Sequence, residues 1–404
     1  MAESNTPPYL RFTGHRHLTH RLVLSTLTGR PIRVSKIRSS SLDSPGLAPH
    51  EVSFFRLLEA VTNGSQIEFS MTGTALAYKP GLITGSAAGY GSSSGVIKHE
   101  IPATNTRGIS YYLIPLCLLA PFSKSPVNIQ FMGPGVITSA TEIGDVSVDT
   151  VRTAILPLYE SFGITNKLEI RTTQRSNPGQ GGIGGAGEVQ LIFGHQVRLP
   201  KTIHLLNPGR VKSIRGVAYA TGVAGANNAM MIESARGVLN PFCADTRIFS
   251  ENTSAGFVSA PEKSNPRAKR KVGVGFGLSL VAETSTGVRY SADVASPIEG
   301  GVPADEIGRM CAFQLLEVVE RGGCVSSIAA PTMLTLMSMG SEDVGRLLMG
   351  KDVLASADIV QLARDFKDFG CGNFGLREEV EREEPCVVVS IKGQGVGNVG
   401  RKHA

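Results

Sequence analysis

Hydrophobic and polar positions alternate with two different periods along this chain. The segments Pro31 to Ile37 and Ile67 to Ser70 alternate as strands do, whereas Arg21 to Gly29 and His50 to Thr62 place their apolar residues roughly on one face of a helix. Strand-like and helix-like segments keep replacing each other. The pattern therefore predicts an α+β or α/β protein rather than an all-helical one.

The C-terminal part has longer helical segments. The spacing predicts helices over Ala229 to Leu239, Asp305 to Arg321 and Ala330 to Met339, followed by a final strand at Cys386 to Ile391. This pattern predicts that helices and strands continue to alternate up to the C-terminal end of the chain.

Two features predict how the chain is divided. The segment KPGLITG at Lys79 to Gly85 is echoed 54 positions later by GPGVITS at Gly133 to Ser139, each after a strand containing Ile-x-Phe, which indicates a repeated unit of sheet and helices. Between Pro200 and Glu283 the pattern of predicted elements changes. A strand-like SIRGVAYATGV is followed there by a helix and a basic loop. We therefore expect a large domain formed by residues 1–199 and 284–404, with a small domain, 200–283, inserted into it.

Composition excludes several classes of protein. With 41% hydrophobic and 18% charged residues, the chain can bury a sizeable core and is not disordered as a whole. The six cysteines form no CxxC pair and have no neighbouring histidine cluster, and the first residues lack an apolar signal core, so we expect reduced thiols in the cytosol or nucleus. No apolar run approaches the roughly 20 residues of a membrane span. We expect neither a metal site nor a membrane partner.

The positive charge is concentrated in two places. The first 40 residues carry seven Lys or Arg against one acid, Glu3, and include His15, His17 and His20. A second cluster lies in a loop-like stretch and comprises Arg267, Lys269, Arg270 and Lys271. Such clusters are typical of a partner with a phosphate backbone. A solvated basic surface or, for the second cluster, a nuclear-import signal would produce the same pattern.

The recognisable enzyme motifs are absent or in the wrong context. Gly182, Gly184 and Gly187 match G-x-G-x-x-G, but this loop runs into the strand-like EVQLIF, whereas a dinucleotide site must open a helix. The chain has no P-loop motif, and its eight histidines all precede residue 205 except His403. We therefore expect a glycine-rich connection between strands and no cofactor.

One group of charged residues near the C-terminus suggests a catalytic function. Arg364, Asp365 and Lys367 lie in LARDFKDF, where helical spacing places the two cations on one face beside a carboxylate. A metal-free ribonuclease could use the carboxylate as base and the cations to stabilise a phosphorane. Ordinary ion pairs on an exposed helix are the simpler interpretation.

Six stretches connect the chain with a known family. In family order they are LSTLTGRPIRVSKIR, SPGLAPHE, PGLITG, PGRVKSIRGVAYATGV, GFGLSLVAETSTG and DEIGRMCAFQLLEVVERGGCV. Together they resemble the RNA 3'-terminal phosphate cyclases, and specifically the eukaryotic cyclase-like branch of that family. The resemblance implies a large domain of repeated units, each a four-stranded sheet with two helices, and a smaller inserted α/β domain.

The chain departs from the family where the chemistry would occur. Family cyclases adenylate a histidine near the C-terminus, pass AMP to an RNA 3'-phosphate and close a 2',3'-cyclic phosphodiester. Here Phe12 to Arg16 replace the Glu-Gly-Gly-Gly-Gln signature, Gln394 stands at the expected nucleophile position, and Ser326 replaces the usual Asp. An amide cannot form the phosphoramidate intermediate. We expect no cyclisation and assign no catalytic residue; a residual cyclase would be revealed by a covalent AMP adduct.

The resemblance also implies a cellular role. The cyclase-like branch acts in the nucleus and nucleolus, as a factor of the small-subunit processome needed for early pre-rRNA cleavages and for 18S rRNA. Its partners there are a nucleolar ribosome-assembly GTPase, pre-rRNA and processome proteins. We expect Arg16, Arg21, Arg38 and His50 to bind an anion or the RNA backbone. The alternative is an endoribonuclease that cuts the spacer upstream of the small-subunit rRNA with Arg364, Asp365 and Lys367.

Overall fold

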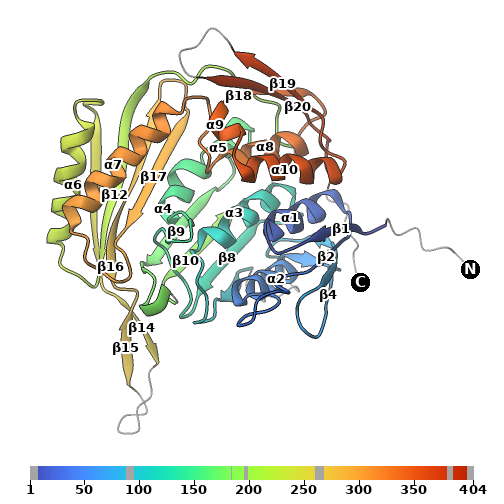
Figure 1. Ribbon diagram of the computed structural model, residues 1–404, viewed down its shortest axis with the longest axis horizontal. Coiled ribbons are helices and arrows are strands. Elements are labelled where there is room, and N and C mark those ends of the chain that lie inside the picture. Colours follow the sequence, from blue (N-terminus) through green and yellow to red (C-terminus); the bar gives the residue numbers. More distant parts are fainter. Residues whose placement is uncertain are drawn as a thin grey trace, which may run out of the picture.

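The structure is a computed structural model that describes residues 8–87, 95–182, 184–194, 199–259, 268–379 and 385–397. The described chain forms four four-stranded sheets, each covered by helices, and a two-stranded ribbon projects from the body (Figure 1).

Three of the sheets share one topology. In each, the first strand pairs in parallel with the second, the second is antiparallel to the fourth, and the fourth is antiparallel to the third. In the order in which they pair, the strands of the first sheet are β1 (Leu10–Thr13), β2 (Ile32–Ser35), β5 (Leu76–Lys79) and β4 (Gln66–Phe69). Those of the second are β7 (Ile97–Glu100), β8 (Val127–Met132), β10 (Glu188–Phe193) and β9 (Glu169–Gln174). Those of the third are β11 (His204–Leu205), β18 (Val344–Gly350), β20 (Cys386–Lys392) and β19 (Phe374–Glu379).

Helices connect the parallel strands, because a parallel pair needs a long crossover. The first unit contains α1 (Leu18–Thr28), α2 (Pro49–Val61) and a small sheet of β3 (Thr62–Asn63) with β6 (Leu82–Ile83). The second contains α3 (Ser110–Leu119), α4 (Val148–Thr150), α5 (Leu158–Ser161), the 3₁₀ turns Ala120–Phe122 and Gln180–Gly182, and the π-helical segment Val151–Ile155. The third contains α8 (Ala330–Met339), α9 (Lys351–Leu354) and α10 (Ala357–Asp368).

The fourth sheet is inserted between β11 and α8 and has a different order. It runs β13 (Thr246–Thr253), β12 (Val211–Thr221), β16 (Gly275–Thr284) and β17 (Arg289–Ala295). The helices α6 (Ala226–Leu239) and α7 (Ala304–Glu320) pack beside each other on this unit, and β14 (Gly256–Ser259) and β15 (Lys269–Val272) form the ribbon. The domain end expected at residue 283 lies inside β16, and β17 and α7 continue the unit beyond it.

A hydrophobic core runs through the units. The most apolar stretch of the sequence forms α3, whose side chains are buried on almost every side, including Tyr112, Leu116 and the proline Pro115. A helix buried all round lies between other elements, and α3 contacts both α1 and α8. This packing brings the beginnings of helices from three units close together.

The fold class expected from the sequence is confirmed: the protein is α+β, with repeated units of a four-stranded sheet and helices plus an inserted α/β unit. The proposed repeat distance is wrong, however. The Ile-x-Phe segment at 67–69 lies in β4, the third strand of its unit, whereas that at 129–131 lies in β8, the second strand of its unit. The echoed turns are therefore not equivalent positions of the structural repeat.

Candidate functional site

A cavity of about 760 Å³ lies where the three repeated units meet. Five helices turn their N-terminal ends toward it, and they come from all three units: α1, α2, α3, α8 and α10. Each of these helices has ten residues or more. The first turn of a helix carries unpaired N–H groups and the positive end of its dipole. Convergence of several such ends makes the cavity favourable for an anion.

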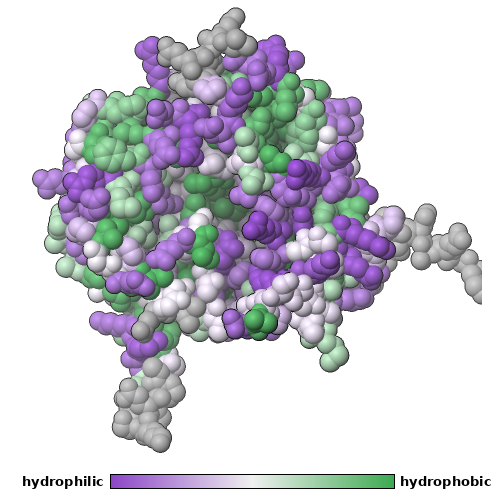
Figure 2. All heavy atoms as spheres, in the orientation of Figure 1, coloured by the Kyte–Doolittle hydropathy of each residue, from purple (hydrophilic) through white to green (hydrophobic). Residues whose placement is uncertain are grey.

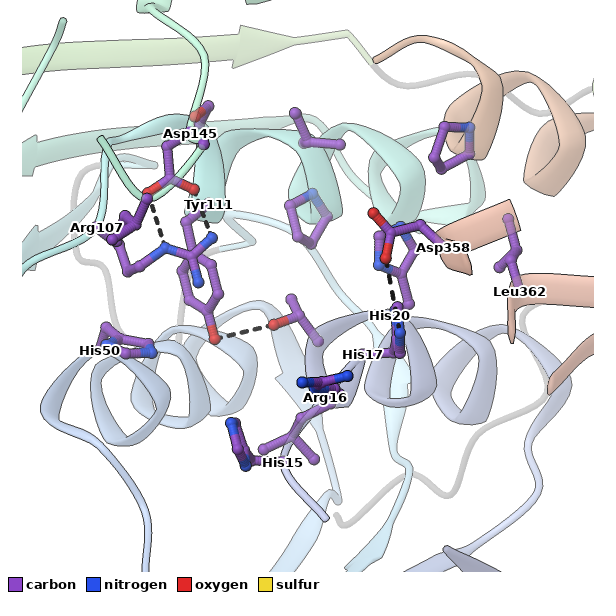
Figure 3. A pocket seen from close by; sticks show the side chains of 18 of the residues that line it. His15, Arg16, His17, His20, His50, Arg107, Tyr111, Asp145, Asp358 and Leu362 are labelled. Atoms are coloured by element: carbon purple, nitrogen blue, oxygen red, sulfur yellow. Dashed lines mark hydrogen bonds and ion pairs between the residues drawn. The ribbon is translucent and has the colours of Figure 1, made fainter. Parts of the chain in front are cut away.

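The segment before α1 supplies polar side chains to the cavity. It holds His15, Arg16 and His17, and the backbone of His17 is left-handed with φ 58°, immediately before the first helical residue. Figure 3 shows His15 and Arg16 beside the start of α1, with His17 and His20 further along toward α10. Arg16 is exposed and forms no ion pair with another described residue. It is therefore free to bind an anion.

Arg38 is committed to an internal ion pair. Its two terminal nitrogens donate to the two carboxylate oxygens of Glu51 at 2.7 and 2.9 Å, and one of them also donates to the carbonyl of Gly46 at 3.0 Å. Glu51 in turn accepts from the N–H of Ala48 and so holds the start of α2. The Glu51 side chain is 4% exposed. Arg38 borders the cavity, but its charge is already balanced.

Arg107 is balanced in a similar way on the opposite side. Its guanidinium forms a two-point ion pair with Asp145 and lies 4.4 Å from the centre of the Tyr111 ring. Asp145 also accepts from the N–H of Gly108 at 2.8 Å. Figure 3 shows this pair above the Tyr111 hydroxyl, which accepts a hydrogen bond from Thr19 of α1. The pair thus fixes the loop before α3 against the loop before α4.

Arg21 lies beneath the cavity and does not line it, although its partner Asp365 does. It donates to both carboxylate oxygens of Asp365, at 3.0 and 3.2 Å, and its guanidinium lies 4.5 Å from the centre of the Phe12 ring. The side chains of Arg21 and Asp365 are 9% and 1% exposed. Gln361 donates to the same carboxylate at 2.9 Å. This buried pair joins the first unit to α10 and leaves neither partner free to bind RNA.

Three histidines at the cavity, His15, His20 and His50, are held neutral. Burial lowers the pKa of His50 and of His20 to about 4, and the charge of nearby His17 also lowers that of His20. Burial, followed by the charge of Arg38, lowers the pKa of His15. His50 packs edge-on against Tyr111, with ring centres 5.1 Å apart. At neutral pH these rings can therefore donate or accept hydrogen bonds but add no full positive charge.

The structure separates the residues of the ribonuclease hypothesis. Arg364 and Lys367 are exposed on α10 and do not line the cavity, whereas Asp365 points inward to Arg21. Arg364 and Lys367 therefore do not flank a free carboxylate, because Asp365 is bound to Arg21.

Gln394 lies away from the cavity as well. Its N–H donates to the carbonyl of Ser338, near the C-terminal end of α8, whereas the cavity is at the other end of that helix. Ser326 is buried and accepts from the N–H of Ala329 ahead of α8. His403 and Arg267 lie outside the described residues. The assignment of Gln394 to a lost nucleophile position stays a prediction.

Several cavity residues were missed by sequence reasoning. Arg107, Tyr111, Asp145 and Asp358 stand in no motif, and the partners in the Arg107 ion pair are 38 positions apart. His15 and His17 were noted only as part of a basic segment. The one local signal was the density of histidine and arginine ahead of the first helix.

The described residues contain no cluster of three or more metal-binding side chains and no helix long and apolar enough to cross a membrane. All six cysteines are buried, and none of them forms a disulfide bond with another described residue. The G-x-G-x-x-G stretch leads into strand β10 and not into a helix.

Known proteins match nearly the whole chain. A family model described as RNA 3'-terminal phosphate cyclase matches residues 10–370. The rRNA processing protein rcl1 of Schizosaccharomyces pombe is 39% identical over 97% of this chain and 98% of its own length. The human RNA 3'-terminal phosphate cyclase-like protein is 37% identical over 97% of both chains. The rRNA processing protein RCL1 of Saccharomyces cerevisiae is 34% identical over 99% of this chain and all of its own length.

Proposed function

This chain belongs to the RNA 3'-terminal phosphate cyclase family, and on that premise we propose that it acts in rRNA processing by binding pre-rRNA, without closing a cyclic phosphate. The observation that carries the proposal is the cavity itself. It has the helix ends that favour a phosphate, and Arg16, which forms no ion pair with another described residue, while Glu51, Asp145 and Asp365 each bind an arginine. Such a site would bind an anion, but these three carboxylates are not free to act as a general base.

The lack of a histidine at the expected nucleophile position supports the same proposal. Residues 205–402 contain no histidine, so the stretch around Gln394 has none to adenylate. His20 and His50 border the cavity from the first unit, and they are neutral at pH 7 because burial lowers their pKa to about 4. A placement role needs neither an adenylated residue nor a free base.

The finer role follows from the family branch. The chain would work in the nucleolus as a factor of the small-subunit processome, needed for the early pre-rRNA cleavages that lead to 18S rRNA. It would act there with a nucleolar GTPase. The names of the relatives, which refer to rRNA processing, support this direction. The endoribonuclease alternative gains nothing from the geometry, because its carboxylate, Asp365, is already bound to Arg21 and Gln361.

A pair of variants tests the cavity. Arg16→Gln should weaken binding of a pre-rRNA spacer fragment about tenfold or more, since a charge-assisted hydrogen bond contributes about 1.5–3 kcal/mol, with the thermal midpoint unchanged. Lys98→Gln removes the same charge from an exposed site on β7 and serves as the matched control. Equal affinity in both variants would mean that the cavity does not contact RNA.

The chemistry is tested in the same preparation. Incubation with ATP labelled at the α-phosphate should give no covalent AMP adduct, and the spacer RNA should remain intact. An adduct would restore the cyclase interpretation. Cleavage of the RNA would favour the endoribonuclease.

A further inference from the structure

The ribbon formed by β14 and β15 contributes little to the hydrophobic core. It projects from the body beside the inserted unit, and Figure 2 shows hydrophilic side chains next to an apolar patch along its described part. Phe257 is 55% exposed there, and Lys269, Arg270 and Lys271 are all exposed. An isolated two-stranded hairpin is at best marginally stable in water, so the fold must hold this ribbon in place.

The base of the ribbon is clamped to the second unit. The N–H of Asn177 donates to the carbonyl of Gly273 at 3.0 Å, and the Gln174 side chain donates to the carbonyl of Ser254 at 2.7 Å. A Cβ on Gly273 would lie 2.2 Å from the carbonyl oxygen of Gly185, and Gly273 has φ +73°. Only glycine fits such an approach. The base of the ribbon thus packs closely against the glycine-rich loop that precedes β10.

The basic side chains of the ribbon lie on both of its faces. Phe257 pairs across the ribbon with Lys271 and Ser259 pairs with Lys269, whereas Arg270 pairs with Val258. Cross-strand partners share a face and successive residues alternate. Lys269 and Lys271 therefore lie on the face of Phe257, and Arg270 lies on the other. None of the three cations forms an ion pair with another described residue.

We propose that this ribbon is an RNA-binding arm that lies in the wide, shallow minor groove of a helical segment of RNA. Positive side chains on both faces of one narrow element fit two phosphate backbones, one on each side. Phe257 adds an apolar contact with a sugar or an unpaired base. A single basic surface would need cations on one face only. The inference rests on the proposed function, because it names the surface that would grip the pre-rRNA.

Charge-neutral substitutions test the arm in the full-length protein. The triple variant Lys269→Gln, Arg270→Gln, Lys271→Gln should bind an RNA hairpin with a long stem at least about tenfold more weakly than the unchanged protein, and the slope of log affinity against log salt should fall by about 2 to 3. The matched control is Lys98→Gln, Lys124→Gln, Arg346→Gln, which removes the same charge from exposed residues without ion pairs among the described side chains. The control should keep at least half of the affinity and most of the slope.

Each other outcome overturns a different statement. If the unchanged protein binds the hairpin and both triple variants bind it equally well, the arm proposal is wrong while the rRNA role stands. If the unchanged protein does not bind RNA at all, the proposed function itself fails. If the ribbon variant keeps its RNA affinity but no longer accumulates in the nucleus, the cluster is an import signal that contacts a protein receptor. Phe257→Ser, which keeps every charge, should weaken binding without changing the salt slope.

Discussion

The cavity and the ribbon are both rich in cations but use them in opposite ways. Around the cavity, Arg21, Arg38 and Arg107 each bind a carboxylate, and the three carboxylates have side chains no more than 5% exposed. On the ribbon, Lys269, Arg270 and Lys271 are exposed and without such partners among the described residues. Counting basic residues in the sequence cannot distinguish these two cases. Whether a cation binds a ligand or holds the fold depends on what carboxylate the fold brings to it.

The largest expected effect concerns the buried pair beneath the cavity. Asp365→Asn leaves the Arg21 charge buried without its counter-charge and should lower the free energy of unfolding by about 3–5 kcal/mol. The double variant Arg21→Met, Asp365→Leu should recover much of that loss, since both charges are then gone. Urea unfolding followed by circular dichroism measures both. A loss below about 1 kcal/mol in the single variant would show that this arginine does not hold the fold.

An intermediate effect distinguishes the two regions by pH. Burial lowers the pKa of His20 and His50 to about 4, so the unfolded chain binds more protons than the folded chain between pH 6.5 and 4. Stability should therefore be complete above pH 6.5 and fall as the pH drops toward 4. His50→Gln should flatten this fall in thermal midpoints measured across the range. The ribbon triple variant should keep the full slope, because it leaves both buried histidines in place.

The smallest effect is expected on the outer face of α10. Arg364→Gln, Lys367→Gln should change the free energy of unfolding by less than about 0.5 kcal/mol, because both side chains are exposed and away from the cavity. RNA affinity should change no more than in Lys98→Gln, Lys124→Gln, and the RNA should remain uncut in every case. Specific cleavage that disappears only in the α10 variant would make these residues part of a ribonuclease.

Much of the fold could be predicted locally, because periodicity records which face of an element is buried. The helix predicted over Ala330 to Met339 has those ends in the structure, and the predicted final strand is β20. The echo of KPGLITG and GPGVITS misplaced the repeat, because similar turns follow strands that occupy different places in their sheets. The small domain was expected to end at residue 283, which would separate β16 from its partner strand β17. A change in the sequence pattern does not reveal which strands pair.

The site was predicted less well than the fold. Arg16, Arg38 and His50 do border the cavity, but Arg21 is buried beneath it, and the role of Arg38 is to pair with Glu51. Nothing in the local sequence distinguishes Arg16 from Arg21, which lie five positions apart. One side chain points outward from the segment before α1, and the other is buried within the first turns of that helix.

The sequence by itself determined the types of element, the absence of a histidine from residues 205–402 and the family. Each of these depends on residue identity or on neighbours a few positions away. Only the tertiary structure decided which cations are free. The partner of Arg21 is 344 positions distant, and that of Arg107 is 38 positions away. Electrostatic interaction depends on distance in space and on burial, and both are set by how the units pack.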